Sequence, residues 1–248
     1  MDDIFEADRA AKYERWLETP AGSAYLEASC ALIDRVLDCR RGWRVLDVGC
    51  GAGAHLAHLA QRGMLLTGVE AGPVMATVAS RRLGHKAEIK VASAYDLPYE
   101  DNTFDAVIMV NTLELLDRPG QALAEAARVA GSRVCLVSLN RLSLSWWYCR
   151  LSGPDHPYSC VRRLPIWVLL RRVREVLGPV PVNWAGATVW PGLRPRVGRR
   201  PLGGMVAVSA AVTPRYGTRP LVLPAQPHPP RAQPIIGAGQ VSLLRRVK

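Results

Sequence analysis

Three closely spaced glycines that follow an acid form the clearest chemical pattern in the sequence. Residues 44–56, RVLDVGCGAGAHL, run from an apolar stretch through Asp47 to Gly49, Gly51 and Gly53 and into a helical pattern. Glycines at this spacing let the backbone turn sharply and let a ligand approach where a Cβ would clash. Asp47 stands where a carboxylate would repel a pyrophosphate and attract a cation. The pattern predicts a ligand-binding turn for a molecule with a positively charged end.

Short apolar runs that alternate with helical segments predict the elements that position this turn. Such alternation, from residue 44 onward, is typical of a parallel sheet with crossover helices. Strands are expected at 44–48, 65–69, 88–91, 104–110 and 133–139, and two more at 182–189 and 205–212 could complete the sheet. Helices are expected at 54–62, 73–83, 118–130 and 165–177. Pro73 suits a first helical turn and Gly84 suits the position after the last.

The two ends of the chain differ from this central region. Residues 1–40 predict two amphipathic helices joined at Thr19-Pro20-Ala21-Gly22, with Ser23 as the N-cap of the second. They are expected to form an N-terminal helical cap on a domain at 41–213. Residues 214–248 hold seven prolines with little periodicity, which predicts a flexible basic tail.

The charge of the chain is unevenly distributed. Of 248 residues with a net charge of +11, residues 1–140 contribute −4 and residues 141–248 contribute +15. An anionic membrane or RNA could bind this basic region peripherally, and amino-acid composition alone is an equally open explanation. DNA is not expected as a partner.

The remaining composition favours a cytoplasmic globular protein. The acidic start MDDIFEADR is unlike a signal peptide, and no apolar run approaches the ~18 to 20 residues of a membrane span. The cysteines are expected to be free thiols because they lie far apart, without CxxC or Cys/His clusters, which also argues against a metal site. They are Cys30, Cys39, Cys50, Cys135, Cys149 and Cys160.

DVGCGAG at 47–53 closely resembles motif I of the class I S-adenosylmethionine-dependent methyltransferases. The resemblance implies S-adenosyl-L-methionine as the cofactor, whose ammonium and sulfonium groups suit Asp47. It also implies an α/β, Rossmann-like methyltransferase fold: a seven-stranded, mostly parallel sheet with helices on both faces. Residues 141–180 would then be an insertion on the acceptor side.

The resemblance extends through GVEAGPVM at 68–75 and through 91–129, which is similar to the methyltransferase type 11 and quinone-biosynthesis subgroup. It implies that Glu70 binds the ribose hydroxyls and that Ser93 replaces the usual adenine-binding acid, with Asp96 as a possible substitute. Leu115 stands where relatives often carry a histidine base. The implied cofactor-binding residues are Asp47, Gly49, Cys50, Gly51, Gly53, Glu70, Ala71, Ser93, Ala94 and Asn111.

Methyl transfer from a sulfonium is an in-line displacement, so alignment of the acceptor outweighs any single side chain. No catalytic residue can be assigned, and Tyr13, His156 and Arg141 are the candidates. The acceptor is expected to be a small or lipid-like molecule, in a pocket built from the N-terminal helices and the segment after the fifth strand. Polar and aromatic residues there, for which packing or solvent exposure is the competing explanation, are Tyr13, Trp16, Asn140, Arg141, Ser143, Trp146, Trp147, Tyr148, His156 and Tyr158.

Two other functions compete with methyl transfer. A catalytically inactive S-adenosylmethionine-binding protein is compatible with Ser93, with Leu115 and with a shortened turn at residues 130–133. An NAD-dependent oxidoreductase is disfavoured by Asp47 and by the lack of a recognisable Tyr-x-x-x-Lys pair. Binding of S-adenosylmethionine without NAD, followed by an acceptor screen, separates the three.

Overall fold

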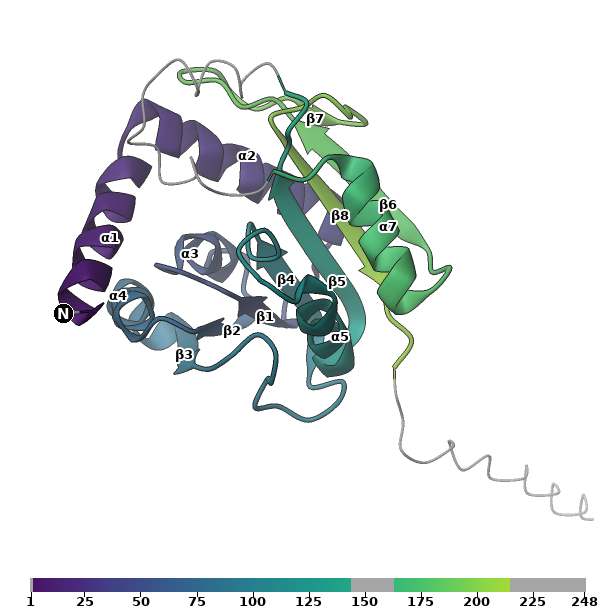
Figure 1. The fold of residues 1–248 in the computed structure, drawn as a ribbon, viewed down its shortest axis with the longest axis horizontal. Coiled ribbons are helices and arrows are strands. Elements are labelled where there is room, and N and C mark those ends of the chain that lie inside the picture. The colour runs from purple at the N-terminus through teal and green to yellow at the C-terminus, as the bar shows by residue number, and fades with distance from the viewer. Residues whose placement is uncertain (1, 144–162, 215–248) are drawn as a thin grey trace, which may run out of the picture. The chain divides into compact units, whose positions relative to one another are not determined.

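One mixed sheet of eight strands organises the computed structural model, which describes residues 2–143 and 163–214 (Figure 1). The sheet order is β3-β2-β1-β4-β5-β8-β6-β7. Strands β1 to β5 pair in parallel, whereas β8 pairs antiparallel with both β5 and β6, and β7 pairs antiparallel with β6. The strands are β1 (Arg44–Val48), β2 (Leu65–Glu70), β3 (Ala87–Val91), β4 (Phe104–Val110), β5 (Ala130–Leu139), β6 (Val182–Ala187), β7 (Val197–Gly198) and β8 (Met205–Ala211).

The strand directions bring several loops to one edge of the sheet. Because β8 is antiparallel to both β5 and β6, β6 runs in the same direction as β1 to β5. Figure 1 shows the arrowheads of β5 and β6 at the same end of the sheet and that of β8 at the other. We call the edge where β1 to β6 end the carboxyl edge. Open α/β sheets bind their ligands outside this edge.

Helices cover both faces of the sheet. On one face lie α2 (Pro20–Leu37), α3 (Ala54–Ala60) and α4 (Pro73–Leu83), and on the other lie α5 (Pro119–Val129) and α7 (Ile166–Leu177). Helix α1 (Asp2–Leu17) contacts α2 and α4. A short 3-10 helix, Gly84–Lys86, joins α4 to β3. This arrangement confirms the expected α/β fold with helices on both faces.

The core consists of two apolar layers separated by the sheet. Alternate residues of β1 face opposite layers, so that Val45 packs with the α2 and α3 side and Leu46 with the α5 and α7 side. Helix α2 contributes fully buried Leu32 and Leu37 and contacts β5, β6 and β8. Burying a leucine side chain stabilises a fold by roughly 1.5–3 kcal/mol. The second N-terminal helix is therefore part of the main core as well as a cap.

Three details of the sequence prediction are wrong. The sheet has eight strands instead of seven, because the two residues of β7 pair with Gly186 and Ala187 of β6. Residues 130–133 belong to β5 instead of a surface turn, since Ala130 is buried and pairs with Phe104. The N-cap of α2 is Thr19 instead of Ser23: Pro20 begins the helix, and the Thr19 side chain accepts a hydrogen bond from the Gly22 amide at 3.1 Å.

Contacts group Met1–Arg215 into one compact unit that contains both the N-terminal helices and the sheet. The boundaries expected at residues 40 and 141–180 stay predictions, and the tail at 214–248 lies almost wholly outside the described residues. In the described ranges no helix is long and apolar enough to cross a membrane. The described cysteines, Cys30, Cys39, Cys50 and Cys135, are free, and Cys149 and Cys160 lie outside.

The cap at the start of α2 yields a stability test. Thr19→Ala removes the side-chain acceptor of the Gly22 amide and should lower the free energy of unfolding by about 1 kcal/mol. Ser23→Ala, four residues further on, should change it by less than about 0.5 kcal/mol, because the Ser23 hydroxyl forms only an exposed 3.4 Å contact with Glu27. Denaturant titration measures both values, and a larger loss for Ser23→Ala would contradict the assigned cap.

Candidate functional site

The glycine loop between β1 and α3 is held in a conformation that favours glycine. Gly49, Gly51 and Gly53 have φ angles of +74°, +52° and +76°, values that side chains with a Cβ rarely adopt. A Cβ on Gly49 would lie 2.6 Å from Thr112 Cγ2, and one on Gly53 would lie 2.8 Å from Leu83 Cδ1. On Gly51 a Cβ would meet only Met75, at 3.6 Å. The outer glycines therefore serve packing, and the middle one leaves an open approach to the backbone.

Asp47 lies near the end of β1, two residues before this loop, and is almost completely buried. Its exposed fraction is 1%, and neither carboxylate oxygen has a hydrogen-bond partner among the described residues. Burial, with a smaller contribution from the charge of Glu70, raises the pKa of Asp47 to about 8. An isolated buried carboxylate is costly unless something compensates it. A cationic or hydrogen-bond-donating ligand would provide that compensation.

Glu70, the last residue of β2, faces the same loop. Its Oε2 accepts a hydrogen bond from the Gly51 amide at 2.8 Å, and its Oε1 accepts one from the Gly72 amide at 3.1 Å. These two bonds fix the carboxylate between the glycine loop and the start of α4. Both oxygens can still accept further hydrogen bonds, and the expected contact of Glu70 with the ribose hydroxyls stays a prediction.

The residues after β3 form a loop at the carboxyl edge. The Ser93 hydroxyl is exposed and accepts a hydrogen bond from the Tyr95 amide at 3.2 Å. Ser93 also forms an isolated bridge with Asp96, which is exposed. Ala94 is half-buried, and Ala71, after β2, is exposed. Ser93 and Asp96 therefore lie within one tight turn. The structure does not distinguish between them, and an adenine contact by either residue stays a prediction.

Asn111, the first residue after β4, joins three elements through its side chain. Its Nδ2 donates to Tyr25 Oη at 2.7 Å, and its Oδ1 accepts from the Leu139 amide at 3.0 Å. Its φ angle is +52° and it is 2% exposed. The amide thus ties β4 to α2 and to the end of β5. Its expected contact with the cofactor stays a prediction. Tyr25 could not be identified from the sequence, because its position in an apolar helical pattern does not indicate a hydrogen bond to Asn111.

Cys50 in the loop and His55 in α3 are both buried. Burial raises the pKa of the Cys50 thiol, which leaves it a poor nucleophile. The Nε2 of buried His55 lies 2.9 Å from Ser29 Oγ. Burial, and to a lesser extent the charge of His58, lowers the pKa of His55 to about 4. His55 is therefore neutral near pH 7 and packs against α2.

The catalytic candidates lie in different places. Tyr13, on α1, is half-buried with its ring 6.0 Å from that of Trp16, which in turn lies 5.2 Å from the ring of Tyr25. Arg141 is exposed just beyond β5. The other acceptor-side residues, His156, Trp146, Trp147, Tyr148 and Tyr158, lie outside the described residues. Tyr13 therefore begins an aromatic series that leads to Asn111.

Glu114, in the loop after β4, is a titratable group that sequence reasoning missed. It is 7% exposed, and its Oε1 has no partner in the described ranges. Burial raises its pKa to about 7, against the lowering effects of the Ser138 hydroxyl and the charge of Arg172. The signal in the sequence is a glutamate surrounded by leucines at 113–116. Leu115 itself is 65% exposed.

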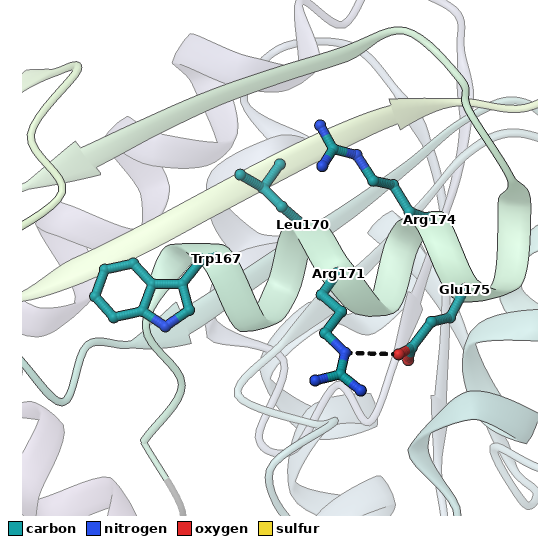
Figure 2. A pocket seen from close by; sticks show the side chains of 5 residues that line it. All are labelled: Trp167, Leu170, Arg171, Arg174 and Glu175. Atoms are coloured by element: carbon teal, nitrogen blue, oxygen red, sulfur yellow. Dashed lines mark hydrogen bonds and ion pairs between the residues drawn. The ribbon is translucent and has the colours of Figure 1, made fainter.

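A pocket of about 330 Å³ lies on the outer face of α7 (Figure 2). Its lining consists of Trp167, Leu170, Arg171, Arg174 and Glu175, and Figure 2 shows the ion pair between Arg171 and Glu175. None of these residues belongs to the glycine loop or to the ends of β1 and β2. This pocket is thus separate from the carboxylates of Asp47 and Glu70. Among the described side chains, no group of three or more His, Cys, Asp or Glu residues could hold a metal ion.

Residues 46–136 match the protein family described as the methyltransferase domain. The matched segment begins within β1, contains the glycine loop, Glu70 and Asn111, and ends within β5.

Curated relatives match part of the chain. The chain is 35% identical over 154 residues to the demethylmenaquinone methyltransferase of Tropheryma whipplei, an alignment that covers 60% of this chain and 59% of that protein. It is 36% identical over 110 residues to the chloroplastic tocopherol O-methyltransferase of Arabidopsis thaliana, covering 41% of this chain and 32% of that protein. The alignments thus span from 32% to 59% of the length of these relatives.

Solved structures share the fold. A possible histamine N-methyltransferase from Thermotoga maritima aligns with a TM-score of 0.65 at 20% identity, over 81% of this chain and 94% of that one. Magnesium protoporphyrin IX methyltransferase from Synechocystis, solved with bound S-adenosylhomocysteine, aligns with a TM-score of 0.59 at 16% identity, over 82% and 94%. Residues 46–136 therefore match a methyltransferase domain, and the chain shares the fold of these solved methyltransferases.

Proposed function

We propose that this protein transfers a methyl group from S-adenosyl-L-methionine to a small, lipid-like acceptor. The single observation that carries the proposal is the buried carboxylate of Asp47, which has no hydrogen-bond partner among the described residues and lies two residues before the glycine loop. A nucleoside with a cationic amino-acid end matches that carboxylate, whereas a pyrophosphate does not.

The residues around the loop fit this cofactor in size and charge. Gly51 leaves its backbone open to a ligand, and Glu70 presents two oriented acceptors one strand away. Asp47 would face the cationic end, while Glu70 would face the ribose. The other proposed contacts are Gly49, Cys50, Gly53, Ala71, Ser93, Ala94 and Asn111.

When bound, S-adenosylmethionine supplies an activated methyl group on a positively charged sulfur. The protein must bring the acceptor into line with that methyl group and exclude water, an effect with a ceiling of roughly 7–11 kcal/mol. Tyr25 and Asn111 would hold the ends of α2, β4 and β5 together beside this space. Tyr13 and Arg141 remain the described candidates for contact with the acceptor.

The names of the relatives support a lipid-like acceptor. The aligned proteins include a demethylmenaquinone and a tocopherol methyltransferase, both named for molecules with a ring and a long apolar tail. An acceptor of that type needs an apolar access route. The chain exposes Leu115 where a histidine base is common in relatives, so the proposed reaction suits an acceptor that reacts as an anion.

Substitution of the two carboxylates tests the cofactor site. Asp47→Ala and Glu70→Ala should each weaken S-adenosylmethionine binding by more than tenfold, about 1.4 kcal/mol or more, because each removes an acceptor aimed at the ligand. The matched control is Glu88→Ala, which removes a side chain that is 63% exposed on neighbouring β3. Calorimetry measures the affinities, and circular dichroism checks the fold. Unchanged affinity in both site variants would refute the assignment. Binding without turnover in a quinol screen would identify an inactive binding protein.

The raised pKa of Asp47 predicts a pH dependence of binding. Below a pKa of about 8 the free protein holds a proton on Asp47, which a cationic ligand must displace. Affinity should therefore rise roughly tenfold per pH unit between about pH 5.5 and 7, where the cofactor's own α-ammonium stays charged. Asp47→Asn should bind weakly with a flat profile over this range. A flat profile for the natural protein would contradict the role of Asp47.

A further inference from the structure

The exposed apolar side chains of the protein gather at one edge of the sheet. Eight large apolar residues are exposed in the described part of the chain, and six of them belong to the carboxyl edge next to β4, β5, β6, β8 and α7. These six are Leu115, Leu142, Trp167, Trp190, Leu193 and Leu202. The other two are Leu65, at the start of β2 on the opposite edge, and Val91, at the end of β3, which lies on the carboxyl edge but is separated from the six by β2 and β1. Scattered exposed leucines need no explanation, but a group on one edge does.

The topology explains how distant segments reach this edge. Leu115 follows β4 and Leu142 follows β5, while Trp190 and Leu193 lie in the loop after β6. Leu202 immediately precedes β8, which starts where β5 and β6 end. All of these positions are therefore at the carboxyl edge.

Two sets of hydrogen bonds fasten the neighbouring segments to the end of β5. The side-chain amide of Asn140, which is 1% exposed, donates to the carbonyl oxygens of Pro201 at 2.7 Å and Gly203 at 2.8 Å. The Leu164 amide donates to the Leu139 carbonyl at 3.0 Å, which places the first turn of α7, with Trp167, beside the same strand end. The buried asparagine expected to line an acceptor pocket thus anchors the turn before β8.

Arginines surround the exposed apolar residues. Arg141, Arg194, Arg196, Arg199 and Arg200 are all exposed. Within the described ranges none of these five forms an ion pair, although the Arg199 guanidinium lies 5.4 Å from the centre of the Trp184 ring. Residues 188–204 contain four arginines and no Asp or Glu. We call these five arginines and the six apolar residues the carboxyl-edge rim.

The outer face of α7 continues the rim away from the edge. Figure 2 shows Trp167 at one end of the shallow pocket and the guanidinium groups of Arg171 and Arg174 along it. Arg171 is neutralised by Glu175 at 2.7 Å. Trp167 and Arg174 thus add an exposed aromatic ring and an exposed cation to this face. Basic amphipathic helices with tryptophan are typical of membrane surfaces.

We propose that the carboxyl-edge rim docks on an anionic lipid bilayer. Arginine pairs with lipid phosphates, tryptophan favours the headgroup level, and leucine inserts among acyl chains. Each Lys or Arg near such a surface contributes about 1 kcal/mol. Docking in this orientation turns the edge that carries the glycine loop towards the lipid. The docking itself is independent of the proposed function. Only the idea that docking delivers a lipid-like acceptor rests on the proposed function.

Three other occupants fit the rim less well. A second copy would bring two basic surfaces together, and residues 215–248 carry six basic and no acidic residues, so this segment has the same sign of charge as the rim. RNA binding uses arginine and aromatic stacking, but exposed Leu193 and Leu202, at 63% and 66%, contribute nothing to it. The combination of exposed leucines and arginines therefore favours an anionic lipid bilayer over these three occupants.

Vesicle binding by the full chain tests the proposal. The protein should co-sediment with vesicles of phosphatidylcholine containing about a third phosphatidylglycerol, and at least tenfold less with phosphatidylcholine alone. Arg194→Gln/Arg196→Gln should weaken binding to the anionic vesicles at least tenfold, because the loss of each charge corresponds to about fivefold. Leu193→Ser/Leu202→Ser should weaken it at least fivefold.

Matched variants at the opposite edge serve as controls. Arg40→Gln/Arg41→Gln removes two exposed charges before β1, and Leu65→Ser removes a leucine that is 63% exposed, as Leu193 is. Neither should change vesicle binding by more than about twofold. The rim variants should also retain the S-adenosylmethionine affinity of the natural protein, so that a failed cofactor site and a failed docking surface are told apart.

Three results would overturn the proposal. Equal binding to neutral and anionic vesicles would exclude recognition of lipid charge. Unchanged binding in both rim variants would place the contact elsewhere, for example in the tail. Binding of poly(U) that is lost in Arg194→Gln/Arg196→Gln, without vesicle binding, would make the surface an RNA site.

Discussion

A buried carboxylate with no hydrogen-bond partner in the described part of the chain is the constraint on which the rest of this structure depends. Asp47 lies at the end of a central strand, where the surrounding core raises its pKa to about 8. Because folding raises that pKa, the ligand-free protein loses stability as the pH rises from about 4 towards about 8. A cationic ligand reverses this effect by compensating the charge. The fold therefore carries a local cost that a bound ligand removes.

The surrounding elements make that compensation geometrically possible. The glycine loop follows Asp47 by two residues and turns through positive φ angles, and Glu70 holds the loop by accepting a hydrogen bond from the Gly51 amide. Asn111 then ties β4 to α2 and β5. The same strand ends carry the rim of exposed leucine, tryptophan and arginine. The proposed cofactor site and the rim thus share one edge because β6 runs parallel to β5.

Much of this architecture could be predicted from local patterns. The strands at 44–48 and 104–110 agree with the structure because short, almost continuously buried apolar runs specify them, and the helix at 73–83 agrees because Pro73 and Gly84 mark its boundaries. The N-cap at Thr19 was missed because Ser23 is an equally good cap by residue type, and only the position of Pro20 decides between them. The hydrogen bond between Tyr25 and Asn111 joins residues that are 86 positions apart in the sequence. The position of the rim depends on β8 pairing antiparallel with β5 and β6. Neither leaves a periodic signal.

The most direct test of the central claim is the ionisation of Asp47 itself. Carbon-13 NMR titration of the side-chain carboxyl groups, with Asp47→Asn to assign the resonance, gives its pKa in the free and bound protein. We expect a pKa of about 8 without ligand and a fall to about 5 or below with S-adenosylmethionine bound, because an adjacent cation favours the charged form. A pKa near 4 in the free protein, or one that S-adenosylmethionine leaves unchanged, would contradict the account.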